Sequence, residues 1–315
     1  MKILRAEHLG MCFGVRDAVA LALQEAATQP LTVLGDLVHN ETVLARLQTA
    51  GIRFQNEVGL VATARVMITA HGASDRKLAE ARQRGLHVIE ATCPLVHLAH
   101  RSLKMLVSEG FYPIIIGKRD HVEVRGMTED LAQFDVVLDE SEMVDLEERQ
   151  RFGVVAQTTQ PIEKVRRLVQ ALRERFPKSE VRFIDTVCQP TKQRQHAATG
   201  LARQCDVVVV VGGAHSNNTH ELVKSCSQFC ACVHHVQTAD DLLPNWFNAD
   251  DTVGITAGTS TPDYVIAEVE QRLGELAAAN SLTAKAKAAM KKMAAPARVS
   301  MKQAEYHAAK AQLVK

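Results

Sequence analysis

The amino-acid sequence predicts an α/β fold whose parallel sheets carry helices on both faces. Two observations indicate this fold. Short runs rich in Val and Ile alternate with longer segments in which apolar residues recur at helical spacing. Three cysteines, at positions 12, 93 and 188, each follow such a short run, so that one lies in each third of the chain. A chain of 315 residues is long enough for two or three small units of this kind.

Six apolar runs are typical of buried parallel strands. They are residues 31–35, 66–70, 113–117, 152–156, 206–211 and 252–256. Between them, residues 162–176 and 191–204 have the apolar spacing of helices. Ligands of parallel sheets bind beyond the carboxyl ends of the strands, so the polar residues after each strand are the candidate functional residues.

The first cysteine lies in a turn between a short strand and a helix that begins near Val15. Gly10 and Gly14 flank Cys12, and glycine permits unusual backbone angles and close approach of other groups. Such a turn suits a bulky ligand on the sulfur. Cys93 and Cys188 share another local pattern, in which Ile, an acidic residue and two further residues precede the cysteine and Pro follows within two positions.

Histidines and small polar residues follow other strands. His39, His71 and His121 could bind zinc, but with phosphate-type loops nearby we favour hydrogen bonding to an anion. Those loops place Gly-Gly ahead of Ser216, Asn217 and Asn218, and Gly ahead of Thr259, Ser260, Thr261 and Pro262. Both lie at expected helix N-termini, where free N–H groups favour phosphate. The alternative is that Ser216, Asn218, Ser260 and Thr261 are helix N-caps.

A second group of cysteines and histidines includes Cys226, Cys230, Cys232, His234 and His235. Its spacing matches no zinc pattern. We expect Cys226 on a helix and Cys230 and Cys232 at the start of the next strand, where cysteine acts as a small buried hydrophobe. Cys205, ahead of a run of valines, has the same interpretation.

The composition predicts a cytoplasmic protein. No run approaches the length of a membrane span, and the first seven residues lack the apolar core of a signal peptide. Seven cysteines, an odd number, argue against a disulfide framework and favour metal or redox chemistry. We therefore expect neither a membrane nor a nucleic acid as partner.

The positive charge gathers at the C-terminus. Residues 281–315 hold eight Lys or Arg against one acidic residue, which makes this part +7 and the rest −6. We expect residues 278–315 to form a basic, Ala- and Lys-rich tail, helical or flexible, that Pro296 divides in two. The tail either is a solvated extension without a role or steers an acidic redox partner to the body.

Several separated motifs resemble one enzyme family. They are GMCFGV at 10–15, VHN at 38–40, AHG at 70–72, ATCPLV at 91–96, HVEVRG at 121–126, QTT at 157–159, DTVC at 185–188 with RQ at 194–195, SNN at 216–218 and TAGTSTPD at 256–263. In this order and spacing, over about residues 1–275, they closely resemble the 4-hydroxy-3-methylbut-2-enyl diphosphate reductases of the non-mevalonate isoprenoid pathway. Val122, Leu9 and Gln193 depart from the family pattern but are not site residues.

The resemblance implies a trefoil of three pseudo-symmetric α/β units with parallel sheets around a central iron–sulfur cluster. The units would be residues 13–93, residues 94–188, and residues 189–277 with 1–12. Cys12, Cys93 and Cys188 fall on the ligands of a [4Fe-4S] cluster with three protein ligands. His39, His71, His121, Ser216, Asn217, Asn218 and Ser260 fall on the diphosphate site. Glu123 falls on the proton donor and Thr158 on the threonine near the substrate hydroxyl.

The implied reaction is the reductive dehydroxylation of (E)-4-hydroxy-3-methylbut-2-enyl diphosphate to isopentenyl and dimethylallyl diphosphate, with electrons from a ferredoxin- or flavodoxin-type donor. Two other functions are alternatives to this reaction. A nucleotide-binding oxidoreductase could use the Gly212-Gly213 turn, but the full Gly-x-Gly-x-x-Gly fingerprint is missing. A cluster- or zinc-binding regulatory module would have no need of Glu123 and Thr158.

Overall fold

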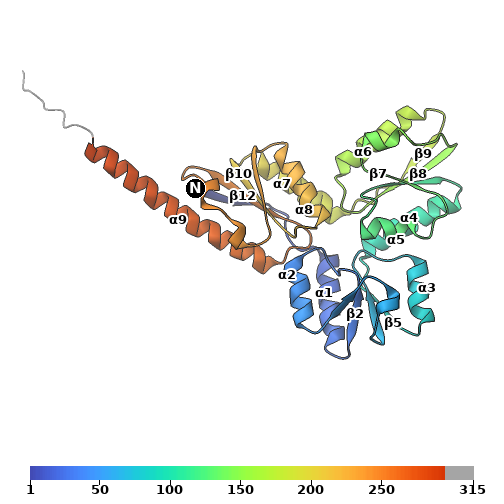
Figure 1. Ribbon diagram of the computed structural model, residues 1–315. Helices are drawn as coiled ribbons and strands as arrows, with labels where there is room; N and C mark the ends of the chain where they lie inside the picture. Colours follow the sequence, from blue (N-terminus) through green and yellow to red (C-terminus); the bar gives the residue numbers. More distant parts are fainter. Residues whose placement is uncertain (295–315) are drawn as a thin grey trace, which may run out of the picture.

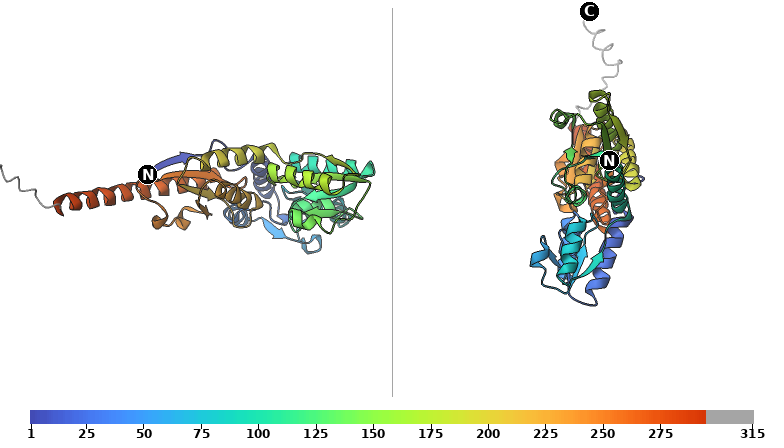
Figure 2. Two further views of the ribbon diagram at one scale, coloured as in Figure 1. Left: turned by 90° about the horizontal axis from the view of Figure 1, so that it is seen from above. Right: turned by 90° about the vertical axis from the view of Figure 1, so that its right-hand side faces the viewer.

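The chain folds into three α/β lobes, each built on a sheet of four parallel strands (Figure 1). The structure is a computed structural model that describes the backbone of residues 1–294 and the side chains of residues 1–282. The lobes form a flat body from which one long helix projects (Figure 2). The α/β class with parallel sheets, expected from the alternation of apolar runs and helical segments, is confirmed.

The first sheet has the strand order β3-β2-β4-β5. Its elements are α1 (Phe13–Ala26), β2 (Leu31–Leu34), α2 (Glu41–Thr49), β3 (Arg53–Gln55), the 3-10 helix η1 (Val58–Leu60), β4 (Arg65–Ile68), α3 (Asp75–Gln83) and β5 (His87–Glu90). Successive residues of a strand point to opposite faces, so Val33 packs against α1 and α2 while Leu34 packs against α3. Burial on both faces explains the continuous apolar runs.

The second sheet repeats this arrangement in the order β7-β6-β8-β9. Its elements are α4 (Pro94–Ser108), β6 (Tyr112–Ile116), α5 (Val122–Thr128), β7 (Asp135–Val137), the 3-10 helix η2 (Glu140–Met143), β8 (Arg151–Ala156), α6 (Ile162–Arg175) and β9 (Glu180–Phe183). Val154 packs against α6 on one face, and Val155 packs against α4 and α5 on the other.

The third sheet has the order β1-β12-β10-β11, so that the first strand of the chain pairs with the last one. Its elements are β1 (Lys2–Arg5), α7 (Gln189–Ala202), β10 (Val207–Val211), α8 (Asn217–Ser227), β11 (Cys232–Val236), the 3-10 helices η3 (Ala239–Asp241) and η4 (Pro244–Trp246), β12 (Thr252–Ala257) and α9 (Asp263–Ala294). The five valines of β10 are all buried. Alternate valines face α9 and the pair α7 and α8.

All six strands expected from apolar runs are present. The pattern does not predict the edge strands β3 and β7, which have three residues each and are too short to show a period. The strands of each sheet fall within one of the three residue ranges expected as units. The loops after the strands, where the candidate residues lie, therefore gather at the carboxyl edges of three sheets.

Helix α9 runs without a break across the expected start of the tail at residue 278. Leu276 is buried, and Asn280 Nδ2 donates a hydrogen bond to the carbonyl of Phe247 at 3.0 Å. The tail was expected to begin at residue 278 and to be helical or flexible. Residues 278–294 instead continue α9, while Pro296 and the rest of the tail lie outside the described residues. None of the helices in residues 1–294 has both the length and the apolar character that a membrane span needs.

Candidate active site

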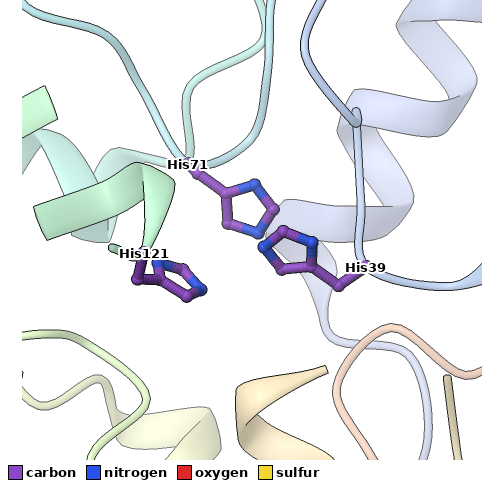
Figure 3. Close-up of side chains that lie close together, drawn as sticks. All are labelled: His39, His71 and His121. Atoms are coloured by element: carbon purple, nitrogen blue, oxygen red, sulfur yellow. The ribbon is translucent and has the colours of Figure 1, made fainter. Parts of the chain in front are cut away.

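Three histidines from two lobes point toward one another (Figure 3). His39 follows β2, His71 follows β4, and His121 is the N-cap of α5. The ring centroids of His39 and His71 are 4.3 Å apart. The ring centroid of His121 lies 5.1 Å from that of His39 and 5.5 Å from that of His71. One nitrogen of each ring lies within 4.8 Å of the others. The sequence interpretation that grouped these residues therefore places them correctly in space.

Burial favours the neutral form of all three rings. Burial lowers the pKa of His39, lowers that of His71 well below its ordinary value, and lowers that of His121 to about 3. His121 Nδ1 accepts a hydrogen bond from the Glu123 N–H at 3.1 Å, which leaves the proton of the neutral ring on Nε2. His39 Nε2 and His71 Nδ1 have no partner. Buried polar atoms without partners indicate a site built for a polar ligand.

The start of α8 and the loop after β12 form another wall of the same cavity. His39, Ser216, Asn217, Asn218 and Ser260 are among the residues that line it. The cavity has a volume of about 30 Å³, and a second cavity of about 260 Å³ shares His39 and His121 with it and also includes Lys118, Arg125 and His215. A ligand larger than water therefore needs both spaces or a movement of the lobes.

Of the loop residues that could have been helix N-caps, one is an N-cap. Ser216 caps α8, because its Oγ accepts a hydrogen bond from the Thr219 N–H at 3.3 Å. Asn218 instead accepts a hydrogen bond from the Thr259 N–H at 2.9 Å, and its Nδ2 has no partner. Ser260 donates to the carbonyl of His39 at 3.0 Å. Asn218 thus ties two segments of the third lobe together, Ser260 ties the third lobe to the first, and neither residue caps a helix.

The glycines of the Gly-Gly turn are required for close packing. A Cβ atom on Gly213 would lie 2.6 Å from the carbonyl oxygen of His39, and one on Gly212 would lie 2.3 Å from Thr219 Oγ1. His235, whose role the sequence did not reveal, supports this turn through a 2.9 Å hydrogen bond between its Nε2 and the carbonyl of Gly212. In a dinucleotide-binding turn the glycines leave space for the ligand. Here protein atoms occupy that space, which argues against the nucleotide-binding alternative.

Glu123 and Thr158 form a buried pair beside the histidines. The Thr158 N–H donates to Glu123 Oε1 at 2.7 Å, and Thr158 Oγ1 donates to Oε2 at 3.0 Å. Burial raises the pKa of Glu123 to about 7, although both hydrogen bonds lower it. Glu123 lies two residues after His121, and from the sequence we expected both on one side of an extended segment; this expectation is wrong for Glu123. It lies in the first turn of α5, because the His121 side chain caps that helix.

Cys12, Cys93 and Cys188 occupy equivalent positions in the three lobes. They are the N-cap residues of α1, α4 and α7, and no side chain of theirs caps its helix. Their backbone N–H groups donate to the carbonyls of Thr259, Ala70 and Thr158 at 2.9, 3.0 and 3.0 Å. Each cysteine is thus tied to a loop that contains or adjoins a candidate substrate residue.

The three thiols lie near one another in a partly buried environment. Burial raises the pKa of Cys93 and raises that of Cys188 to about 11, and the charge of Cys12 raises both further. A Cβ atom on Gly14, two residues after Cys12, would lie 2.5 Å from the sulfur of Cys93. Burial therefore disfavours the ionised form of these thiols. The positive ends of three helix dipoles, together with a bound cation, would stabilise the thiolates.

The chemistry of the donor atoms tests which metal centre the thiols fit. Among the described residues, the group that could hold a single metal ion is formed by the three histidines. The three cysteines lie apart from that group at helix N-termini, and iron–sulfur clusters are held by thiolates of this kind. The donor set therefore fits an iron–sulfur centre.

The other cysteines and histidines of the third lobe show no such site. Cys226 and Cys230 are buried and packed with Cys205 against β10, as expected. Cys230 precedes β11, which begins at Cys232 and not at Cys230. His234 stacks on Trp246 with ring centroids 3.9 Å apart. These contacts account for the group without a metal.

Comparisons with known proteins identify the family. The model of the LytB protein family matches residues 3–274. The 4-hydroxy-3-methylbut-2-enyl diphosphate reductase of Pelobacter propionicus is 36% identical over 278 residues, which cover 88% of this chain and 99% of that protein. The enzyme of the same name from Geobacter metallireducens is 34% identical over 284 residues, covering 89% and 100%.

Solved structures agree with these relatives. The E-1-hydroxy-2-methyl-but-2-enyl-4-diphosphate reductase of Plasmodium falciparum has a TM-score of 0.80 at 27% identity, covering 86% of this chain and 87% of that one. The structure titled as (E)-4-hydroxy-3-methyl-but-2-enyl diphosphate reductase, the terminal enzyme of the non-mevalonate pathway, has a TM-score of 0.64 at 34% identity, covering 87% and 100%. The chain therefore belongs to the LytB protein family.

Proposed function

We propose that this protein converts (E)-4-hydroxy-3-methylbut-2-enyl diphosphate to isopentenyl and dimethylallyl diphosphate. The reaction takes up two electrons and two protons, breaks the bond between the allylic carbon and the hydroxyl oxygen, and releases that oxygen as water. The observation that carries the proposal is the convergence of three histidines, the Glu123–Thr158 pair and three cysteines at the centre of a LytB-type fold. The names of the relatives supply the substrate.

The diphosphate would be bound by residues of all three lobes. These are His39, His71, His121, Ser216, Asn217, Asn218 and Ser260. The free nitrogens of His39, His71 and Asn218 supply donors, and the start of α8 adds N–H groups and the positive end of the helix dipole. An anion beside buried neutral imidazoles raises their pKa, so binding favours proton uptake by the histidines. Each charge-assisted hydrogen bond contributes about 1.5–3 kcal/mol.

Glu123 would deliver the proton that lets the hydroxyl leave as water. With a pKa of about 7, its carboxyl group carries that proton in a large share of molecules at neutral pH. The two hydrogen bonds from Thr158 hold the carboxyl group in one orientation, and the hydroxyl of Thr158 can turn toward the substrate hydroxyl. Burial of the pair excludes water that would otherwise exchange the proton.

Cys12, Cys93 and Cys188 would hold a [4Fe-4S] cluster with three protein ligands. The fit rests on three N-cap thiols, one from each lobe, whose charges act on one another. Such a cluster supplies electrons one at a time and an iron without a protein ligand that can polarise the substrate hydroxyl. The three ranges 13–93, 94–188 and 189–277 with 1–12 would then act as units that each contribute one cysteine.

The electrons would come from an acidic donor protein of the ferredoxin or flavodoxin type. A cavity of about 810 Å³ between α6, α7 and α8 has Lys164, Arg167 and Lys192 in its lining, and α7 begins beside Cys188. A cationic surface one helix away from a cluster ligand suits such a donor. The basic tail remains a second candidate for this role, mostly outside the described residues.

Anaerobic purification with iron and sulfide analysis, followed by turnover with a small chemical reductant, tests the proposal. Four irons and four sulfides per chain, together with both isopentenyl products, are expected. Zinc bound at the histidines without iron would instead favour the regulatory module. Iron without turnover of the allylic diphosphate would contradict the proposed reaction.

A further inference from the structure

Arg194, on the second turn of α7, connects that helix to the loop before Cys12. Its Nε donates to the carbonyl of Gly10 at 2.9 Å, and its Nη1 donates to the carbonyl of Pro190, one turn earlier in the same helix, at 3.1 Å. Gly10 stands two residues before Cys12, and Cys188 is the N-cap residue of α7. One guanidinium group thus links the Cys12 loop to the first turn of the helix that begins at Cys188.

The Gly10 carbonyl is presented to Arg194 by a turn that requires glycine. Gly10 has a φ of +74°, and a Cβ atom there would lie 2.7 Å from Ile266 Cδ1. The N–H of Gly10 donates to the carbonyl of Ala257 at 3.2 Å, which anchors the turn to the third sheet. The contact with Arg194 is therefore part of an ordered turn.

The charge of Arg194 is buried without a carboxylate partner. The residue is 8% exposed, and no acidic side chain in the described part of the chain forms an ion pair with it. Burial lowers the pKa of Arg194, and the charges of Cys12 and Cys188 oppose that shift. A buried cation without a counter-charge is costly, so its surroundings must supply negative charge. The nearest source is the group of thiolates.

We propose that Arg194 is a positioning residue that holds the Cys12 loop against the start of α7, beside Cys188, and supplies the counter-charge for an anionic metal centre bound between the two cysteines. The inference rests on the cluster assigned under the proposed function. Reduction adds one negative charge to that centre. A fixed cation nearby stabilises the reduced form more than the oxidised form, and so raises the reduction potential.

The size of the effect follows from Coulomb's law. A unit charge about 12 Å from an added electron, at an effective dielectric constant of about 20, changes the reduction equilibrium about tenfold. For a one-electron couple this corresponds to about 59 mV. A shorter separation gives a larger effect.

The test compares Arg194→Gln and Arg194→Lys with wild-type protein purified anaerobically with its cluster. The control is Arg203→Gln, which removes the same charge from the exposed end of the same helix, where Arg203 lies over the ring of Phe229. Two quantities are measured at equal iron content: the midpoint potential of the cluster, by redox titration, and the rate at which a chelator removes iron.

Arg194→Gln is expected to lower the potential by about 59 mV and to release iron faster. Arg194→Lys keeps the charge but lacks the planar fork that reaches both carbonyls, so it should keep most of the potential and still release iron faster. The control should match wild type in both measurements.

Wild-type potentials in both Arg194 variants, or equal losses in both, would overturn the counter-charge role. Wild-type iron release in both would overturn the positioning role. If Arg194→Gln does not assemble a cluster, the neutral variant Arg194→Met takes its place in the measurement of the potential, and the comparison of Arg194→Lys with the control decides the positioning role. Absence of iron from the wild-type protein would instead refute the proposed function.

Discussion

Replacing Glu123 by Gln removes the proposed proton donor with little change in shape. The wild-type carboxyl group accepts from the Thr158 N–H at 2.7 Å and from Thr158 Oγ1 at 3.0 Å. The amide of Gln can keep both contacts, because its oxygen accepts from the N–H and its NH₂ group donates to the hydroxyl. The variant should therefore fold, bind iron and bind substrate as the wild type does.

The expected loss in turnover is that of a general acid, about 10²–10⁴-fold. This corresponds to a barrier higher by about 2.7–5.4 kcal/mol. The pH profile adds a second signature. Because burial raises the pKa of Glu123 to about 7, the protonated form is lost above that pH, and wild-type turnover should fall as pH rises through 7. The Gln variant should lack this fall.

The same substitution should stabilise the protein at alkaline pH. A carboxyl group whose pKa is about 7 when folded, against an ordinary value of 4.5, contributes stability that is complete below the ordinary value and is lost as pH rises through 7. The difference between the two pKa values is worth about 3 kcal/mol. Urea unfolding at pH 8 should therefore show a larger free energy of unfolding for the Gln variant than for wild type.

Turnover is measured with a small chemical reductant from pH 6 to 9, with iron content and substrate affinity measured in parallel. Glu80→Gln, on the exposed surface of α3, is the matched control and should behave as wild type. A Glu123→Gln variant with turnover within about threefold of wild type, far below the range for a general acid, would refute the reasoning. A retained fall above pH 7 would assign that titration to another group.

Other substitutions test the cluster site and the donor surface. Cys93→Ser should lose most of the iron, whereas Cys226→Ser in the core should retain it; equal iron contents would contradict the ligand assignment. Gly14→Ala places a Cβ atom 2.5 Å from the sulfur of Cys93 and should also lose iron, whereas Gly200→Ala, with no neighbouring atom within 4 Å, should keep it and gain about 0.5–1 kcal/mol of stability. Arg167→Glu should slow reduction by an acidic donor protein at low salt without changing turnover with the chemical reductant; equal slowing with both reductants would contradict a docking role.

Local sequence patterns were sufficient for the fold class, the central strands and the cysteines, histidines and polar loops that follow strands. They did not reveal the edge strands β3 and β7, and Glu123 and Thr158 were candidates only through the family resemblance. The valine run predicts β10 because a parallel strand that is covered on both faces needs an apolar side chain at every position. His39 and His71 could be grouped because parallel strands end at one edge. The Ala and Lys content favours helix after residue 278, but the sequence did not show that this helix continues α9 or that it contacts Phe247.

The properties that make these residues a site depend on tertiary packing. The pKa of Glu123 is raised by burial, and its place on a helix follows from the cap supplied by His121. The pairing of Asn218 with the loop after β12 and the missing counter-charge of Arg194 appear only when separate segments meet. Desolvation and hydrogen bonding depend on the neighbours in space, and these lie 35 residues away in the sequence for Glu123 and Thr158, 41 for Asn218 and Thr259 and 184 for Arg194 and Gly10. For this reason the sequence indicated which residues to examine, and the tertiary structure decided their protonation, orientation and partners.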